Sequence, residues 1–310
     1  MAKTFFGFEE VLAQEIKSIG GRDVQIRNRM VEFYGDLGFL YKANYSLRTA
    51  LRILKPIMNF SVKNDDQLYQ RLLKFHWENY LQVDQTFVIN ATVNSDYFRH
   101  SHYAALKVKD AIADRFTNKY GKRPSVDRYN ADIRFNLHIS HDKVTLSLDS
   151  SGESLHKRGY RTETGPAPIN EVLAAGLLKI AGWDGKGNFL DPMCGSGTML
   201  IEAAMVASEI PAQLHRKHFA FQNWKDYDET LFTSIRNSRI NRIKPFDYKI
   251  VGYDNSPMMV KIAEQNIISA DLVDLIEVKH QDFFTSRKEL FPVLLVFNPP
   301  YDCLLYTSDA

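Results

Sequence analysis

The spacing of apolar side chains predicts a small α+β unit at the start of the chain. Helical periodicity runs through Val11–Ile19 and again through Leu37–Leu47. Between these helices, Met30–Phe33 has the composition of a strand. A further apolar run, Leu51–Leu54, predicts a second strand that ends before Pro56, because proline has no N–H to donate to a sheet.

The same pattern continues over the next hundred residues. It predicts a helix over Asp65–Tyr80, a strand over Thr86–Val93 and a helix over Tyr103–Tyr120 that ends at Gly121. In the last helix the predicted inward-facing positions are Ala105, Val108, Ile112 and Phe116. Residues 131–150 alternate between apolar and polar side chains, which predicts a hairpin with one buried face.

A change in pattern follows. Ser150–Pro168 is rich in Ser, Gly, Thr and Pro, so we expect a linker there and a domain boundary near residues 150–165. Beyond it, short strands alternate with helices, which is typical of a parallel, doubly wound sheet. The predicted strands are Asn188–Leu190, Lys249–Tyr253, Leu275–Val278 and Val293–Phe297, and the predicted helices are Ile169–Ala181, Gly197–Ala207 and Ser256–Ser269.

Composition limits the class of protein. The chain has 310 residues and 45% hydrophobic content, enough for a core and for two or three domains. No apolar run approaches the roughly 18 residues that span a bilayer, and Met1–Lys17 has no signal-peptide core. We therefore expect a cytoplasmic protein that binds no membrane. Two cysteines, Cys194 and Cys303, are too few for a disulfide framework or a cysteine zinc site, and we expect no metal.

Charge is distributed unevenly along the chain. Residues 1–165 carry 25 Lys and Arg against 19 Asp and Glu, whereas the remaining residues carry 14 against 18. A basic first half favours contact with a polyanion, although a solvated surface gives the same pattern.

Candidate chemistry begins at a glycine-rich turn between a strand and a helix. In Asp191–Thr198, Gly195 and Gly197 allow the backbone to approach a ligand, and the helix start offers N–H donors. Asp254 ends the next strand, where a carboxylate accepts the hydroxyls of a bound ribose. It follows Asp191 by 63 residues, compared with about 20 in dinucleotide enzymes. The helix-rich segment 209–246 is thus an insertion, and a nicotinamide enzyme is disfavoured.

Two residues after the third strand suggest a base-binding position. Asp282 can accept a hydrogen bond from an adenine amine, and Phe283 can lie against the ring. A plain loop aspartate is the competing interpretation.

The most specific motif is Asn298-Pro299-Pro300-Tyr301, directly after an apolar strand. Two prolines fix the backbone, so the Asn298 side chain and the Pro299 carbonyl are presented rigidly. Both can accept N–H bonds from an amine conjugated to a ring, which aims the nitrogen at a methyl donor. Tyr301 would stack on the base. The motif therefore predicts methylation of a planar amine by in-line displacement.

These motifs resemble those of the class I methyltransferases, and the resemblance covers nearly the whole chain. Together they are similar to the THUMP-domain bacterial 23S rRNA guanine-N2 methyltransferases. The residues that carry the similarity are Phe6–Leu12, Arg158–Arg161, Ala167–Glu171, Asp191–Glu202 and Asn298–Tyr301. The resemblance implies S-adenosylmethionine as cofactor and ribosomal RNA (23S) as partner.

The resemblance also implies roles for individual residues. The expected cofactor-binding residues are Asp191, Pro192, Gly195, Gly197, Thr198, Asp254, Asn255, Asp282 and Phe283, and the expected catalytic residues are Asn298, Pro299 and Tyr301. The basic element of a THUMP domain corresponds to Lys107, Lys109, Arg115, Lys119, Lys122 and Arg123, which we expect to contact RNA phosphates.

The implied domain order is α+β followed by α/β. We expect a ferredoxin-like subdomain over residues 1–58, a THUMP domain over 59–155 and an incomplete Rossmann-like methyltransferase domain over 156–301. Residues 302–310 depart from the family pattern, which continues with a glycine and an acidic-basic pair. We expect these nine residues to be foreign to the protein, and the chain as given to be poorly stable and inactive.

Other functions remain open at this level. An Asn-Pro-Pro-Tyr site also suits DNA adenine or a protein glutamine, but a THUMP-like first half has no purpose for glutamine. A non-catalytic RNA-binding module would bind no cofactor.

Overall fold

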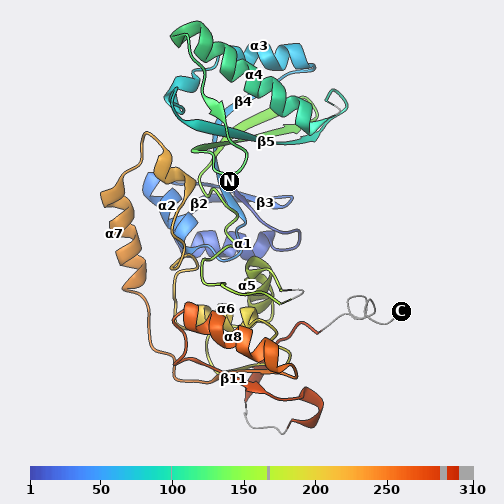
Figure 1. The fold of residues 1–310 in the computed structure, drawn as a ribbon, viewed down its shortest axis with the longest axis vertical. Coiled ribbons are helices and arrows are strands. Elements are labelled where there is room, and N and C mark those ends of the chain that lie inside the picture. The colour runs from blue at the N-terminus through green and yellow to red at the C-terminus, as the bar shows by residue number, and fades with distance from the viewer. Residues whose placement is uncertain (99, 166–167, 287–291, 300–310) are drawn as a thin grey trace. The chain divides into compact units, whose positions relative to one another are not determined.

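The computed structural model describes residues 1–98, 100–165, 168–286 and 292–299 (Figure 1). They form two compact units. The first unit comprises residues 1–3, 52–154 and 218–232, and the second comprises residues 4–51, 155–217 and the described residues from 233 on. The domain boundaries expected at residues 58, 155 and 301 stay predictions.

A sheet in the order β1-β4-β8-β7-β5-β6 runs through the first unit. Its strands are β1 (Ala2–Lys3), β4 (Arg52–Ser61), β5 (Thr86–Asn94), β6 (Ser125–Val126), β7 (Ile133–Ser140) and β8 (Lys143–Asp149). The predicted hairpin is present, because β7 and β8 pair antiparallel. The helices α3 (Asp65–Leu73) and α4 (Ser101–Tyr120) contact each other, and α4 contacts β5 (Figure 1).

Three expectations for this unit need correction. Strand β4 continues through Pro56, because a register shift against β8 after Pro56 accommodates the residue that lacks an N–H. Helix α3 ends at Leu73 instead of Tyr80. The buried Trp77 indole donates to the Leu72 carbonyl at 2.8 Å, so the chain turns into a short 3₁₀ segment, η1 (Trp77–Asn79). In α4 the buried alanines are Ala104 and Ala111, whereas the predicted Ala105 is only partly buried.

The second unit contains the predicted parallel sheet, in the order β11-β10-β9-β12. Its strands are β9 (Asn188–Asp191), β10 (Ile250–Asp254), β11 (Ile276–His280) and β12 (Val293–Leu295). The helices that accompany it are α5 (Glu171–Ile180), α6 (Thr198–Ala207) and α8 (Pro257–Ser269). Because β9 has β10 on one side and β12 on the other, the chain crosses over at β9, which is where parallel α/β sheets bind ligands.

Polar residues mark where two of these helices begin. The Asn170 side chain accepts from the N–H of Val172 and caps α5, and the Ser256 side chain accepts from the N–H of Met259 and caps α8. The second unit also contains α1 (Glu9–Ser18), α2 (Leu37–Ser46) and a hairpin of β2 (Arg22–Arg27) and β3 (Met30–Tyr34). Strand β2 was not predicted, because half of its side chains are charged and nearly all are exposed.

Two segments differ from their expected character. The stretch predicted as a linker is irregular but well packed, since Arg158 and Tyr160 are each 1% exposed. The insertion 209–246 contains a single α-helix among its residues, α7 (Glu229–Ile240), and a 3₁₀ turn, η2 (Ala220–Asn223). Across the part of the chain described by the structure, no helix combines the length and the apolar character needed to cross a membrane.

Candidate functional site

A cavity of about 590 Å³ lies within the second unit, at the carboxyl ends of its parallel strands. Each strand of the sheet contributes its own end or the loop that follows it. The predicted residues that line the cavity are Asp191, Pro192, Gly195, Asp254, Asn255, Asp282, Phe283, Asn298 and Pro299. Residues from four separate parts of the sequence therefore meet at one sheet edge.

The loop after β9 approaches the cavity through its glycines. Gly195 has φ +52°, and a side chain there would meet nothing closer than the Met259 methyl at 3.9 Å, so this position is open toward the cavity. Gly197 has φ +79° and is the residue directly before α6. A Cβ added at Gly197 would lie 3.2 Å from the Cβ of Ala263. The positive φ favours glycine at both positions, and at Gly197 the tight approach to Ala263 favours it as well.

Asp191 is the buried carboxylate of the site. It is 2% exposed, and Oδ1 accepts a hydrogen bond from the Met193 N–H at 3.1 Å. Burial raises the pKa of Asp191 to about 7; the Met193 N–H acts in the opposite direction, and the charge of Asp254 adds to the increase. None of these contributions from the described residues comes from a cation. The carboxylate is thus poised to gain a positively charged ligand.

Asp254 connects the ends of β9 and β10. Its Oδ2 accepts from the Gly195 N–H at 2.9 Å, and its Oδ1 accepts from the Ser256 N–H at 2.9 Å. A carboxylate oxygen has a second lone pair, so both oxygens retain capacity for ribose hydroxyls. The adjacent Asn255 is exposed and also lines the cavity.

The loop after β11 supplies the third acidic residue. Asp282 Oδ1 accepts from the Phe284 N–H at 2.7 Å and caps the short turn η3 (Phe283–Thr285). Phe283 is half-buried, and its ring centroid lies 6.1 Å from that of Phe297. Both predicted residues reach the cavity, and Asp282 also has the structural role of a cap.

Asn298 and Pro299 are brought to the same cavity by β12. This strand pairs with β9, where Leu295 is opposite Leu190, and the Val296 N–H extends the pairing to the Leu190 carbonyl at 3.2 Å. Asn298 is half-buried and Pro299 is exposed. Tyr301, the third predicted catalytic residue, lies outside the described residues.

Two predicted cofactor residues lie behind the cavity wall. Gly197 and Thr198 are buried and are absent from the residues described as lining the cavity. The Thr198 hydroxyl accepts a hydrogen bond from Arg161 at 2.7 Å. Both residues therefore support the conformation of the loop 191–198 without facing the cavity.

Sequence patterns missed several residues of the lining. Gly165, Pro168 and Ile169 come from the segment predicted as a linker, Met259 comes from α8, and Phe284 follows Phe283. Phe284 is 84% exposed. An Asp-Phe-Phe sequence directly after a predicted strand was the available indication for Phe284. Nothing in the sequence indicated that Gly165, Pro168 and Ile169 would line the cavity.

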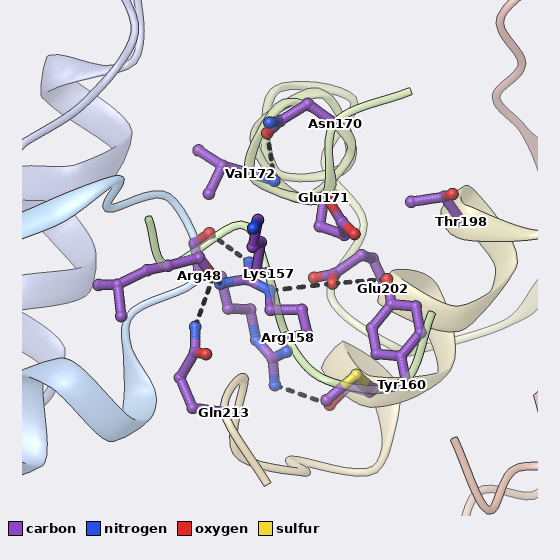
Figure 2. A network of polar contacts seen from close by, with 12 residues as sticks. Arg48, Lys157, Arg158, Tyr160, Asn170, Glu171, Val172, Thr198, Glu202 and Gln213 are labelled. Atoms are coloured by element: carbon purple, nitrogen blue, oxygen red, sulfur yellow. Dashed lines mark hydrogen bonds and ion pairs between the residues drawn. The ribbon is translucent and has the colours of Figure 1, made fainter. Parts of the chain in front are cut away.

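A buried polar network lies next to the loop, within the second unit (Figure 2). The Arg158 guanidinium donates to Glu202 Oε1 at 3.2 Å and to the Arg48 carbonyl at 2.6 Å, and the Tyr160 hydroxyl donates to the same Glu202 oxygen. Arg158 and Glu202 have exposed side-chain fractions of 1% and 0%. Glu202 lies on α6 one turn beyond Thr198, so the network holds the helix that begins at the end of the loop 191–198.

The predicted RNA-binding cations lie in the first unit, on α4 and in the loop after it. Four of them have partners there: Arg115 and Lys119 bind Glu78 Oε1 at 2.8 and 2.6 Å, Lys109 binds Asp110 at 2.6 Å, and the Lys107 ammonium lies 5.3 Å from the Tyr103 ring centre. Lys122 and Arg123 are exposed. Lys119 is exposed as well, although it pairs with Glu78.

Comparison with known families divides the chain into three parts. Residues 1–54 match the RlmL ferredoxin-like domain, residues 62–149 match the THUMP domain, and residues 158–308 match the RMKL-like methyltransferase domain.

Individual relatives agree with these matches. The chain is 37% identical over 310 residues to ribosomal RNA large subunit methyltransferase K/L of Desulfotalea psychrophila, in an alignment that covers 97% of the chain and 43% of the relative. The chain thus spans less than half the length of this curated relative.

Solved structures show the same similarity. SMU.472, described as a putative methyltransferase complexed with SAH, is 30% identical with a TM-score of 0.86, over 97% of this chain and 80% of that one. A predicted N6-adenine-specific DNA methylase from Listeria monocytogenes is also 30% identical with a TM-score of 0.86, over 97% and 79%. The expected fold is confirmed, and the chain belongs to the methyltransferase family that joins an RlmL ferredoxin-like domain, a THUMP domain and an RMKL-like methyltransferase domain.

Proposed function

We propose that this chain is the cofactor- and RNA-binding part of an enzyme that methylates the exocyclic N2 amine of a guanine in 23S rRNA, with S-adenosylmethionine as methyl donor. The observation that carries the proposal is the single cavity shared by Asp191, Asp254 and Asn298. The carboxylates of Asp191 and Asp254 suit a cationic cofactor. The acceptor oxygens of Asn298 and Pro299 suit a planar amine. Similarity to a large-subunit rRNA methyltransferase supports RNA as the substrate.

The residues of the cavity fit S-adenosylmethionine. A volume of about 590 Å³ falls within the range of roughly 300–1,000 Å³ for small-molecule sites. The open face at Gly195 leaves room for a ligand against the backbone, and the unmatched Asp191 carboxylate suits the cationic methionine part. Asp254 would accept the ribose hydroxyls, and Asp282 and Phe283 would hold the adenine. Bound there, the cofactor supplies an electrophilic methyl group and a neutral leaving group.

The protein's contribution to the reaction is orientation of the amine. Asn298 Oδ1 and the Pro299 carbonyl would each accept one N–H of the guanine amine, so that its nitrogen lone pair points at the methyl group. Localising the lone pair reduces its conjugation with the ring and raises its nucleophilicity. Tyr301 is proposed to stack on the base. No covalent intermediate with the protein is required.

RNA binding is assigned to the part of the chain that matches the THUMP domain. Lys119, Lys122 and Arg123 are the exposed cations of the predicted set, and Lys107, Lys109 and Arg115 precede them in the sequence. Contacts of this kind bind phosphates without reading the base sequence. Choice of the guanine would then depend on the cavity.

The direct test is methyl transfer by the full-length product of the gene that encodes this chain. The enzyme is incubated with radiolabelled S-adenosylmethionine and unmodified ribosomal RNA, and the RNA is digested to nucleosides. We expect label in N2-methylguanosine and its loss with Asn298→Ala, while calorimetry shows that Asn298→Ala still binds the cofactor.

Other outcomes would identify the alternative functions. Label in DNA adenine or in protein glutamine would contradict the RNA assignment. RNA binding without any cofactor binding would identify a non-catalytic RNA-binding module.

A further inference from the structure

The segment that precedes α5 forms one wall of the cavity. We call the described residues 161–165 and 168–169 the strap. Gly165, Pro168 and Ile169 of the strap line the cavity. The strap also approaches α8 closely, since a Cβ on Gly165 would lie 2.6 Å from the Met259 methyl. The loop 191–198 forms another part of the cavity lining, so the distance between strap and loop sets the width of the space for a ligand.

Arg161 joins the strap to the loop at Thr198. Its guanidinium donates to the Thr198 hydroxyl at 2.7 Å and to the Ile169 carbonyl at 2.9 Å. Its Nε lies 3.2 Å from Glu171 Oε1, and the side chains of Arg161 and Glu171 are 17% and 3% exposed. One planar group therefore contacts the end of the strap, the first residue of α6 and the first residue of α5. Figure 2 shows Thr198 and Glu171 on these two helices.

Asn266 joins the same two segments at a second point. This residue of α8 is 1% exposed. Its amide nitrogen donates to the Ser196 carbonyl at 3.0 Å and to the Glu163 carbonyl at 3.1 Å. Its amide oxygen accepts from the Thr162 N–H at 3.0 Å. A single buried amide thus satisfies backbone groups of both the loop and the strap.

We propose that Arg161 and Asn266 are positioning residues for the cofactor, which act by fixing the separation between the strap and the loop 191–198. Neither is among the described residues that line the cavity, so both act through the segments that they join. This inference rests on the proposed function, because the cavity is taken as the cofactor site. Fixing the two walls before binding removes an ordering cost that the cofactor would otherwise carry.

The chemistry of the two side chains matches this role. Guanidinium is planar and carries its donors in fixed directions, so Arg161 Nη2 donates to two acceptors while Nε stays within ion-pair distance of Glu171. A lysine ammonium carries its charge and its donors on one nitrogen and cannot reproduce this spacing. An asparagine amide offers donors and an acceptor together, so aspartate at position 266 would lose the donors to Ser196 and Glu163. Conservative replacements should therefore fail to restore full cofactor affinity.

A double-mutant cycle on Arg161 and Thr198 tests the proposal. The dissociation constant of S-adenosylmethionine is measured by calorimetry for the wild-type chain, Arg161→Met, Thr198→Val and the double variant. We expect each single variant to weaken binding about tenfold. The double variant should be no weaker than Arg161→Met, because the hydrogen bond that Thr198→Val removes is already lost in Arg161→Met. Arg161→Lys should lie between Arg161→Met and the wild type.

A matched control separates positioning from general stability. Arg52 in the first unit is a part-buried arginine that donates to Asp149 and to the Gly152 carbonyl. Arg52→Met should lower Tm without changing the cofactor dissociation constant. Wild-type affinity in Arg161→Met, measured below its Tm, would overturn the inference while leaving the proposed function intact. Absence of cofactor binding in folded wild-type protein would overturn the proposed function and the inference together.

Asn266→Asp provides a second arm if Arg161→Met does not fold. It preserves the shape of the side chain and should weaken cofactor binding about tenfold. Unchanged cofactor affinity in folded Asn266→Asp would contradict the role of Asn266.

Discussion

Two carboxylates of this protein lie in opposite electrostatic surroundings. Glu78, next to α4, accepts from Arg115, Lys119 and His76, and these hydrogen bonds hold its pKa well below the ordinary value, although partial burial acts to raise it. Asp191, in the cavity floor, is buried with no cation among the groups that shift its pKa, which burial raises to about 7. The charge of Glu78 is balanced by cations of the protein, whereas the charge of Asp191 is not balanced by any cation that contributes to its pKa.

The difference distinguishes carboxylates that stabilise the fold from carboxylates that are available to a ligand. A matched carboxylate lowers the energy of the folded chain at neutral pH, whereas an unmatched buried one raises it. Such a cost within a cavity indicates a site that a cationic ligand completes. Replacing each carboxylate by its amide should therefore change the free energy of unfolding at neutral pH in opposite directions.

The largest expected effect is on stability in Asp191→Asn. The folded-state pKa of about 7 lies above the ordinary value, so the folded protein holds an extra proton between about pH 4 and pH 7. Wild-type stability should therefore fall as pH rises through this window, by about 4 kcal/mol for about three pKa units. The amide introduced by Asp191→Asn would still accept from the Met193 N–H, and because it does not ionise, the variant would not show this loss.

Urea unfolding from pH 4 to pH 8 measures this effect. The free energy of unfolding of Asp191→Asn should increase relative to wild type as pH rises. Asp282→Asn, at an exposed carboxylate of the same cavity, is the control. A constant difference between wild type and Asp191→Asn across this range would show that Asp191 ionises as an ordinary carboxylate.

The next effect concerns cofactor binding. Because a cationic cofactor favours ionised Asp191, binding below pH 7 should release a proton, and affinity should rise up to about tenfold per pH unit between pH 5 and pH 7. Calorimetry in buffers of different ionisation enthalpy counts the released protons. Asp191→Asn should bind more weakly and without proton release. Equal proton release in wild type and Asp191→Asn would place the titrating group elsewhere.

A smaller effect is expected from Glu78→Gln. Loss of its part-exposed ion pairs should destabilise the protein by about 1 kcal/mol or less at neutral pH. Since the pKa of Glu78 is lowered, this contribution is present above its ordinary pKa and is lost as pH falls toward the folded value. The variant also frees Arg115 and Lys119, so RNA affinity at low salt should rise. Weaker RNA binding by a folded Glu78→Gln variant would show that Glu78 itself helps to hold the RNA.

The smallest effect is expected in the loop after α4. Lys122→Ala and Arg123→Ala should each reduce the salt dependence of RNA binding by about one phosphate contact, with no change in cofactor affinity. Filter binding over a series of salt concentrations measures the slope. The matched control is Lys261→Ala, at an exposed residue of α8.

The sequence was sufficient to predict the sheet edge of the site. Alternating strands and helices predict parallel strands, and parallel strands place Asp191, Asp254 and Asn298 at one edge whatever the length of the connections. The insertion between β9 and β10 therefore did not disturb the prediction. Local periodicity likewise located α4 and its end at Gly121, whose φ is +69°.

The parts that escaped prediction depend on contacts between distant residues. Nothing near Asn266 in the sequence shows that it bonds to Ser196 and Glu163, which lie 70 and 103 positions away. The strap was mistaken for a linker because its composition is that of a loop, while its order comes from Arg161 and Asn266. The predicted strand end before Pro56 was wrong because a bulge can accommodate a proline within a strand, and bulges have weak sequence signatures.

The place of β12 in the sheet has a consequence for folding order. This strand pairs with β9, about a hundred positions earlier, and carries Asn298 and Pro299 to the cavity. Ribosomal synthesis delivers β9, β10 and β11 first, so a gap beside β9 must persist until β12 arrives. Such distant pairing is slow to form. The proposed amine-binding residues Asn298 and Pro299 therefore reach the cavity only after β9, β10 and β11 have been synthesised.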